Sequence, residues 1–317
     1  MKIVALAGGV GGAKLADGLS RVLPAGDLTV VVNTGDDFTH LGLRICPDLD
    51  TVCYTLAELA NPVTGWGRAG ETFAALAEIS ALNGPAWFRL GDRDLGTHLV
   101  RTQRLLTGER LSQVTRAFCL SWGVRAAVLP MSDDPVATIV KTRDNGDLAF
   151  QEYFVKLFCQ PVVTGFQFEG IEQARPAPGV LEAIEAADGI VFCPSNPWVS
   201  IAPILAVSGI REAIQKKSRV VAVSPLIGGQ ALKGPAAKMF AELGWQPSAR
   251  AVAEQYRDIV KLFMLDSADQ ADCEAISQWG IIPYVADILM NDIAGRVRLA
   301  NLALDLLSNQ LGGMQSS

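Results

Sequence analysis

Four stretches of the chain are almost entirely apolar and lack the alternation of a half-exposed strand: 2–7, 28–33, 189–193 and 219–223. Such runs predict strands that are buried on both faces, which is typical of a parallel sheet covered by helices. Each run ends in a glycine, proline or polar turn. The pattern therefore predicts an α/β fold whose ligands bind beyond the carboxyl ends of the strands.

The middle of the chain has a different pattern. Helices are predicted at 72–82 and 111–122, with short strands at 126–130, 137–141 and 150–154. We interpret residues 61–180 as an inserted, largely helical subdomain that forms a lid over the active site. Residues 1–60 and 181–317 would then form the nucleotide-binding core, and 312–317 would be a frayed tail.

The first strand leads directly into a glycine cluster, Gly8 to Gly12, and then into a helix. Glycines at such a turn let the backbone approach a phosphate, whose charge the helix N-terminus stabilises. Gly9, Gly11 and Gly12 are the candidate contacts. The loop matches neither the Walker pattern nor GxGxxG. The alternative is that these glycines only pack the helix tightly on the strand.

Four aspartates follow the second predicted strand: Asp36, Asp37, Asp48 and Asp50. Clustered carboxylates raise one another's pKa and repel a phosphate unless a cation lies between them. Magnesium, which binds carboxylate and phosphate oxygens together, is the predicted cation. The alternative is that Asp48 or Asp50 caps a helix and that Asp36 and Asp37 are turn residues.

Arg93 lies between two aspartates in the segment LGDRDLGTH, which ends at His98. A guanidinium there can bind a planar or anionic ligand, or form a surface ion pair of little energetic value. His98 is a candidate site residue or a structural histidine, and a total of two histidines argues against a histidine-ligated metal. The turns at Ser195-Asn196 and at Ser224 could contact a base or ribose, or serve only as turns.

The amino-acid composition argues against several classes of protein. The net charge of −6 argues against a nucleic-acid binder, which needs a basic surface. The six cysteines contain no CxxC pair, so we expect free thiols in a reducing compartment. The glycine cluster stands where a signal peptide would be apolar, and no run of about 18 apolar residues predicts a membrane span. The sequence therefore predicts a cytoplasmic protein.

Seven motifs in order, GGVGGAKL, VVNTGDD, CPDLDTV, LGDRDLGTH, LPMSDDPV, PSNPWVSI and SPLIGGQALKGPA, resemble the 2-phospho-L-lactate transferase family of deazaflavin coenzyme biosynthesis. The resemblance implies a Rossmann-like fold, usually as a homodimer. It also implies a magnesium-dependent transfer of a phospholactyl or phosphoenolpyruvyl group from a guanosine diphosphate-linked donor to the hydroxyl of a deazariboflavin, with release of GMP.

Carried over by motif, the resemblance implies four sets of site residues. The nucleotide would be bound by Gly9, Gly11, Gly12, Lys14, Asn33, Ser195, Asn196 and Ser224. The deazaflavin would be bound by Asp50, Arg93 and His98. The catalytic residues would be Asp36, Asp48 and Asp50, and the magnesium ligands would be Asp36, Asp37 and Asp48.

One departure from the family pattern leaves the donor open. The loop reads GGVGGAK here, whereas archaeal members have a GGTGTPK form. The main alternative is a regulatory, nucleotide-sugar-binding relative without transferase activity, which should lack the PDLDTV and GDRD pair. A nicotinamide dehydrogenase would need GxGxxG. A non-enzymatic interaction module would not need carboxylates at the sheet edge.

Overall fold

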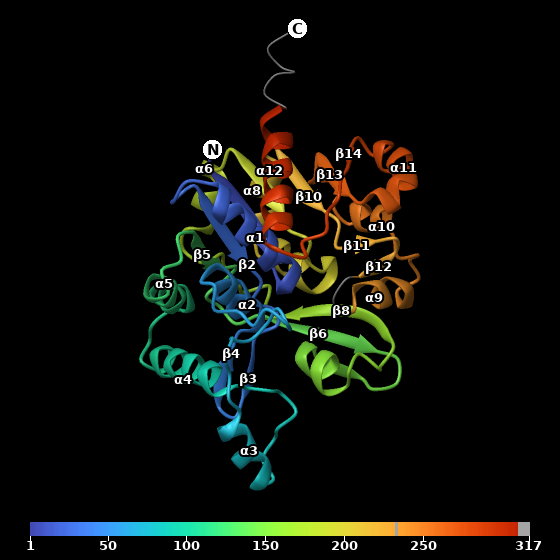
Figure 1. Ribbon diagram of the computed structural model, residues 1–317. Coiled ribbons are helices and arrows are strands. Elements are labelled where there is room, and N and C mark those ends of the chain that lie inside the picture. The colour runs from blue at the N-terminus through green and yellow to red at the C-terminus, as the bar shows by residue number, and fades with distance from the viewer. Residues whose placement is uncertain (232–233, 310–317) are drawn as a thin grey trace.

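The computed structural model, described here for residues 1–231 and 234–309, is built on a seven-stranded sheet whose neighbouring strands are all parallel (Figure 1). In spatial order the strands are β14 (Ile282–Val285), β13 (Leu262–Leu265), β10 (Val220–Val223), β9 (Gly189–Phe192), β1 (Ile3–Ala7), β2 (Leu28–Val32) and β5 (Ala127–Pro130). The four strands predicted from apolar runs are confirmed as β1, β2, β9 and β10.

The strand order reverses direction beside β1. The chain moves outward from β1 to β2 and β5 on one side, and from β9 to β10, β13 and β14 on the other. Such a switch point opens a crevice at the carboxyl ends of the two strands that flank it. The glycine turn follows β1 and the Ser195 turn follows β9, so this Rossmann-like order brings the two turns together.

The sheet is buried on both faces. Along β1, Val4 and Leu6 pack into one core, while Ile3, Ala5 and Ala7 pack into the other. The second core is closed by α1 (Gly9–Val22), α2 (Pro47–Leu56), α5 (Leu111–Ser121) and α12 (Ile293–Asn309). The first is closed by α6 (Val180–Ala186), α7 (Ala202–Ala206), α8 (Ile210–Gln215), α9 (Ala236–Glu242), α10 (Ala249–Glu254) and α11 (Cys273–Ser277). Burial of each large apolar side chain contributes about 1.5–3 kcal/mol, so both layers stabilise the sheet.

Several elements lie beyond the carboxyl edge of the sheet. They include a hairpin of β3 (Phe38–His40) and β4 (Leu43–Ile45), the helices α3 (Ala74–Ala81) and α4 (Asp92–Leu106), and an antiparallel sheet of β7 (Asp147–Ala149), β6 (Ala137–Thr142) and β8 (Val163–Glu169). A second short hairpin, of β11 (Leu226–Ile227) and β12 (Gln230–Ala231), follows β10. Figure 1 shows α3 at the far end of this region from the main sheet. A function as a lid stays a prediction.

Two details of the predicted insertion need correction. Strand β5 lies within 61–180 but pairs with β2, so this stretch supplies an edge strand to the core. The strand expected at 150–154 is wrong, because β7 ends at Ala149 and a π-helix (Glu152–Lys156) follows. Phe150, Tyr153 and Phe154 have helical spacing, and the rings of Phe150 and Phe154 stack 5.4 Å apart. The predicted helices at 72–82 and 111–122 are confirmed as α3 and α5.

Within 1–231 and 234–309, no helix is long and apolar enough to cross a membrane. All six cysteines are free thiols, four of them buried. The expected tail at 312–317 and the motif residues Leu232 and Lys233 lie outside the described residues.

Candidate functional site

The turn between β1 and α1 is held by side chains from two other elements. The Gly8 amide donates to Ser195 Oγ at 3.0 Å, and that hydroxyl donates back to the Gly8 carbonyl at 2.9 Å. The Gly9 amide donates to Asp48 Oδ1 at 2.8 Å. Gly9 has φ +62°, a left-handed conformation that favours glycine. The backbone freedom of glycine is therefore needed at Gly9, at the point where the strand turns into the helix.

Gly11 and Gly12 serve the packing of α1. A Cβ on Gly11 would lie 2.3 Å from the Pro194 carbonyl oxygen, and one on Gly12 would lie 2.5 Å from Ser195 Oγ. Neither glycine has a positive φ. The absence of side chains lets α1 approach the loop after β9, as the packing interpretation predicted. Contact of these two glycines with a phosphate stays a prediction.

Gly11→Ala should therefore act first on stability. The added methyl group meets a backbone carbonyl that cannot rotate away, and overpacking of this kind costs about 1–3 kcal/mol. Thermal unfolding measures the loss. Gly96→Ala in α4 is a matched control, because it has open space around it and should leave the melting temperature unchanged or higher. An unchanged melting temperature with weaker binding of guanosine diphosphate would instead assign Gly11 to the phosphate.

Asp48 lies at the centre of the first acidic cluster. Its Oδ2 accepts hydrogen bonds from Asn33 Nδ2 at 2.9 Å and from Ser200 Oγ at 3.4 Å. Asn33 is fully buried, and its Oδ1 accepts the Gly35 amide at 2.8 Å. Burial raises the pKa of Asp48 to about 6, although the hydrogen bonds from Asn33, Gly9 and Ser200 oppose that shift. Asp48 is therefore a carboxylate that changes charge near neutral pH.

Asp36 lies in the same cluster. Burial, followed by the charge of Asp48, raises the pKa of Asp36 well above its ordinary value. Its Oδ1 is buried and has no hydrogen-bond partner within residues 1–231 and 234–309. Two carboxyl groups that disfavour each other's ionisation can share a proton or a cation.

The other two predicted aspartates are paired with arginines. Arg44 Nη2 lies 3.3 Å from Asp37 Oδ2, and burial raises the pKa of Asp37 to about 6 despite that guanidinium. Arg101, which is 2% exposed, binds both carboxylate oxygens of Asp50, with Nη1 donating to Oδ2 at 2.9 Å. Among the described residues, the four carboxylates thus divide into an Asp36/Asp48 pair without a basic partner and two ion pairs.

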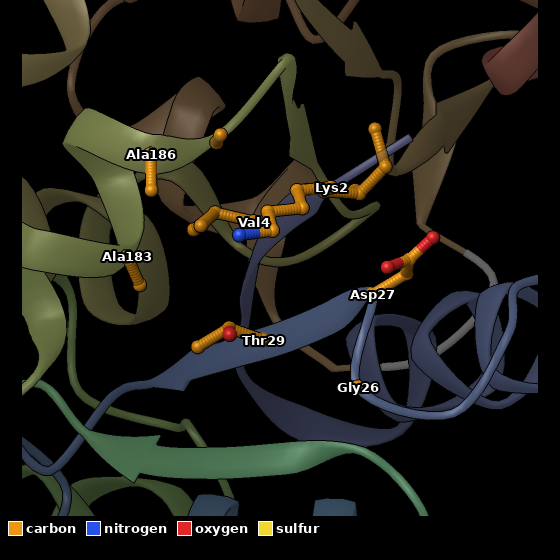
Figure 2. Close-up of a pocket in the computed structure, with 9 residues that line it drawn as sticks. Lys2, Val4, Gly26, Asp27, Thr29, Ala183 and Ala186 are labelled. Carbon is orange, nitrogen blue, oxygen red and sulfur yellow. The ribbon is translucent and has the colours of Figure 1, made fainter.

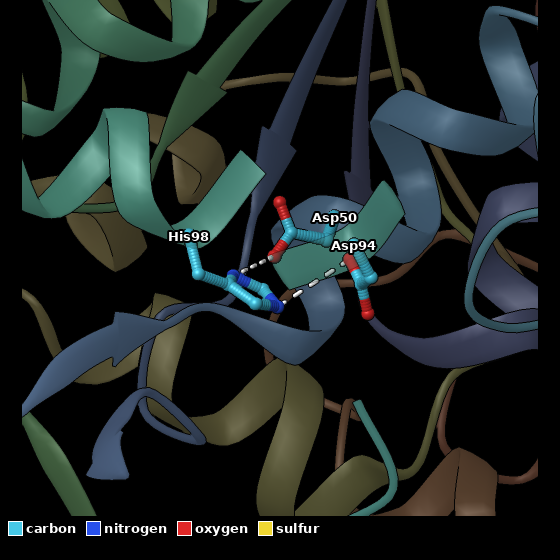
Figure 3. A group of neighbouring side chains, drawn as sticks. All are labelled: Asp50, Asp94 and His98. Atoms are coloured by element: carbon cyan, nitrogen blue, oxygen red, sulfur yellow. Dashed lines mark ion pairs between the residues drawn. The ribbon is translucent and has the colours of Figure 1, made fainter. Parts of the chain in front are cut away.

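His98 extends the Asp50 ion pair into a buried network (Figure 3). Its Nδ1 lies 3.7 Å from Asp50 Oδ2, and its Nε2 lies 3.4 Å from Asp94 Oδ1. Burial opposes ionisation of Asp94, but the neighbouring His98 and the Tyr54 hydroxyl, which donates at 2.6 Å, outweigh it and lower the Asp94 pKa.

The ligand atoms of Asp50, Asp94 and His98 lie within 4.8 Å of one another, a spacing that could hold a metal ion. Arg101 Nη1, however, is 3.2 Å from His98 Nδ1 and also binds Asp50. A guanidinium in this position already supplies the positive charge that these carboxylates need. We therefore describe the group as a buried ion network and not as a metal centre.

The predicted site residues occupy several positions. Gly9, Asn33, Asp36 and Asp48 come together, and Asp50 and His98 lie in the neighbouring network. Lys14 Nζ donates to the Met290 carbonyl at 2.8 Å, and Ser224 Oγ hydrogen-bonds to Leu226 within its own turn. Asn196 Oδ1 accepts the Trp198 amide at 2.9 Å. Arg93 is exposed, and its backbone amide donates to the Glu71 carboxylate. The ligand roles of all these residues stay predictions.

Three polar residues of the two clusters were missed by the sequence reasoning: Arg101, Tyr54 and Ser200. A signal for Arg101 was present, since Asp94, His98 and Arg101 follow one another at i, i+4 and i+7 and share one face of α4. A stripe of polar residues at helical spacing can face inward when its charges are paired. Nothing in the local sequence distinguishes Ser200 from a turn residue.

The surface also has a hollow at the opposite edge of the sheet, near the starts of β1 and β2 (Figure 2). It has a volume of about 160 Å³ and is lined by Lys2, Asp27 and Ala183 among others. The Asp27 carboxylate pairs there with the terminal amine at 3.2 Å. The hollow lies away from the glycine turn and offers no converging set of unpaired polar groups, so the carboxyl edge remains the candidate site.

Comparison with known proteins gives matches over nearly the whole chain. The family model described as 2-phospho-L-lactate transferase CofD matches residues 3–290. Phosphoenolpyruvate transferase from Streptomyces griseus is 46% identical over 96% of this chain and 98% of its own, and that from Kitasatospora aureofaciens is 47% identical over the same shares. The 2-phospho-L-lactate transferase of Methanosarcina mazei is 38% identical over 95% of this chain and 99% of its own.

A solved structure supports the fold independently. The chain is similar to a member of the UPF0052 family from Bacillus halodurans, with a TM-score of 0.63 and 16% identity, over 96% of this chain and 98% of that one.

Proposed function

Because the chain belongs to the 2-phospho-L-lactate transferase CofD family, and is thus a transferase of the phospholactate and phosphoenolpyruvate type, we propose a specific reaction for it. The phospho-acid group of a guanosine diphosphate-linked donor is transferred to the ribityl hydroxyl of a deazariboflavin, and GMP is released. Of the two acids, we propose enolpyruvate, because the relatives at 46–47% identity are phosphoenolpyruvate transferases and those at 38% are 2-phospho-L-lactate transferases.

The observation that carries the proposal is the Asp36/Asp48 pair beside the Gly9 turn. Both carboxyl groups are buried with raised pKa values, and both lie at the carboxyl edge near the switch point of the sheet. Acids whose pKa values are shifted by burial and a neighbouring charge cluster at functional sites. A transfer between a diphosphate and an alcohol needs a group that accepts a proton and ligands for a cation that offsets the negative charge.

Magnesium fits this pair. Asp36 Oδ1 is a hard oxygen ligand that is buried without a hydrogen-bond partner in the described part of the chain, and a second carboxylate lies beside it. We propose Asp36 as the main ligand, and give Asp37 a smaller role than its motif implied because Arg44 already pairs with it. When bound, magnesium would neutralise the charge of the diphosphate.

The residues of the chain would divide the remaining tasks. The acceptor hydroxyl oxygen bonds to the phosphorus that carries the acid, while the bond from that phosphorus to the bridging oxygen breaks and GMP departs with that oxygen. The hydroxyl proton passes to the Asp48 carboxylate, which is ionised above about pH 6. Asn33, Ser200 and the Gly9 amide hold Asp48 in place through hydrogen bonds.

The test is direct. Purified protein is incubated with deazariboflavin, magnesium and each guanylated donor in turn, and the products are identified by mass. We expect the enolpyruvyl donor to give the transferred product and GMP in equal amounts. Donor hydrolysis without transfer, or no turnover of either donor, would contradict the proposal.

Magnesium binding should release protons, because the raised pKa of Asp36 favours its protonated form and the cation displaces that proton. Calorimetry in two buffers with different ionisation enthalpies measures this release. Asp36→Asn should abolish both the release and tight magnesium binding. Binding of equal strength without proton release would place the ion elsewhere.

We further propose a homodimer in the cytoplasm. Large apolar side chains of the region beyond the sheet are exposed, among them Val63 at 86%, Leu82 at 81% and Leu106 at 82%, which favours a covered surface in solution. The free thiols favour a reducing compartment. Light scattering of the purified protein tests the first of these proposals.

A further inference from the structure

Two buried thiols meet between α2 and α5. The Sγ atoms of Cys53 and Cys119 lie 3.7 Å apart, and the two residues are 3% and 6% exposed. They are 66 positions apart along the chain, so only the fold brings them together. Within residues 1–231 and 234–309, this is the one contact between two cysteine sulfur atoms. Neither thiol has a part in the reaction proposed above.

The separation of the two sulfur atoms is short enough for a bond to form between them. The sulfurs of a disulfide lie about 2.05 Å apart, so these two would have to approach by about 1.7 Å. Rotation of the side chains can supply part of that approach, and a shift of the helices the rest. Thiols held this close react with each other far faster than with a thiol in solution, because no second molecule has to be captured.

The pair lies next to residues of the candidate site. Cys53 follows Asp50 by one turn of α2, the helix that also carries Asp48. Phe118, the neighbour of Cys119 in the chain, has its ring 5.9 Å from the Arg101 guanidinium. The first turn of α5 is fixed, because the Ser112 amide and hydroxyl both donate to the Asp133 carboxylate. We therefore expect α2 to take up part of the contraction.

We propose that Cys53 and Cys119 are a reversible oxidation site, at which a peroxide converts the two thiols to a disulfide and the new bond displaces α2 enough to slow catalysis. The dithiol is the active form in a reducing compartment. A thiol reductant restores it after oxidation.

The contact between the sulfurs sets the order of the steps. Its hydrogen bond to Cys119, together with burial, raises the pKa of Cys53 well above the ordinary value, so Cys53 keeps its proton. Cys119 is the more exposed of the two and reacts first: its sulfur bonds to one oxygen of hydrogen peroxide, the O–O bond breaks, and a sulfenic acid and water result. The Cys53 sulfur then bonds to the Cys119 sulfur, the S–O bond breaks, and a second water leaves.

The step balances without a further reactant. The two sulfurs lose two electrons in total and the peroxide gains them, and both thiol protons end in the two water molecules. Burial keeps both thiols slow to react, so the site responds to sustained exposure to a small peroxide and excludes a bulky disulfide.

Peptide mapping tests the bond. The folded protein is treated with hydrogen peroxide, its remaining thiols are blocked in denaturant, and it is digested with trypsin without reduction. Cys53 and Cys119 fall in the tryptic peptides 45–68 and 117–125. We expect these peptides to be linked, with fragment ions that place the bond at Cys53 and not at Cys46, and to separate after reduction. No linked peptides, or a bond at Cys46, would overturn the inference.

Transfer activity tests the consequence of the bond. We expect kcat/KM of the oxidised protein to fall about tenfold or more, because a displacement of about 1 Å in a site can cost that much, and to recover on reduction. Cys119→Ala, or Cys119→Ser should the first not fold, cannot form the bond; it should keep normal activity and lose none to peroxide. Cys273→Ala removes a half-buried thiol of α11 and should stay as sensitive as the unaltered protein.

Two further results would overturn the inference: linked peptides without loss of activity, and an equal loss of activity in a folded Cys119 variant. Melting temperatures show whether each variant is folded. The peptide map does not depend on the proposed function, so a protein without transfer activity can still show the bond.

Discussion

Asp48→Asn is expected to lower kcat/KM for the transfer by about a thousandfold, within the range that general acid–base groups contribute. The amide keeps an oxygen that can accept the Gly9 N–H and the volume that packs against Ser200. It cannot accept the hydroxyl proton. The loss should therefore appear in the rate, with the glycine turn intact.

Stability provides the internal check on that variant. The folded pKa of Asp48, about 6, lies above its ordinary value of 3.8, so folding is favoured by the protonated form. The contribution of Asp48 to the free energy of unfolding falls as the pH rises from about 4 to about 6, and it stays lower at neutral pH. Asp48→Asn removes this titration, so its melting temperature should fall less between pH 4 and pH 7 than that of the unaltered protein.

The control for the charge change is Asp144→Asn, because Asp144 is exposed. It should change neither rate nor melting temperature. Near-normal turnover by folded Asp48→Asn would exclude Asp48 as the base.

Arg101→Met should destabilise the protein by about 3–5 kcal/mol, the largest stability effect that we expect from a single substitution. Methionine fills much of the space but leaves Asp50 buried without its guanidinium, while Asp94 also lies nearby. Denaturant unfolding measures the loss.

The double variant Arg101→Met with Asp50→Asn separates charge from packing. If the unpaired carboxylate causes the loss, removing its charge should restore a large part of the stability. A double variant as unstable as the sum of both single variants would mean that Arg101 acts through packing, for example against the Phe118 ring at 5.9 Å.

The sequence predicted best those strands whose own apolar pattern is enough to identify them. The apolar runs of β1, β2, β9 and β10 predicted the centre of the sheet, since strands buried on both faces need no polar positions. The outer strands β13 and β14 were not identified. β14 reads Ile-Pro-Tyr-Val and is largely exposed, because an edge strand has one neighbour and tolerates proline.

The candidate site was predictable in its residue types but not in its grouping. The motifs placed four aspartates at one strand end, and the structure does bring them close together. Their division into a pair without a cation and two ion pairs depends on Arg101, which lies 51 residues from Asp50 along the chain. No local pattern relates those two positions, since only the fold, which packs α4 on β4 and α5, brings Arg101 to Asp50.

The ion pair between Arg101 and Asp50 also limits which parts of this enzyme can move. Separating α4 from α2 would break the buried ion pair and leave each charge without its partner. Such an opening is therefore a rare event. Entry of a substrate must therefore proceed with α4 in place. The helix α3, none of whose residues is buried, is free to move on a faster timescale, whereas β4 is tied to α4 by the hydrogen bond from the Arg44 amide to Thr102 Oγ1.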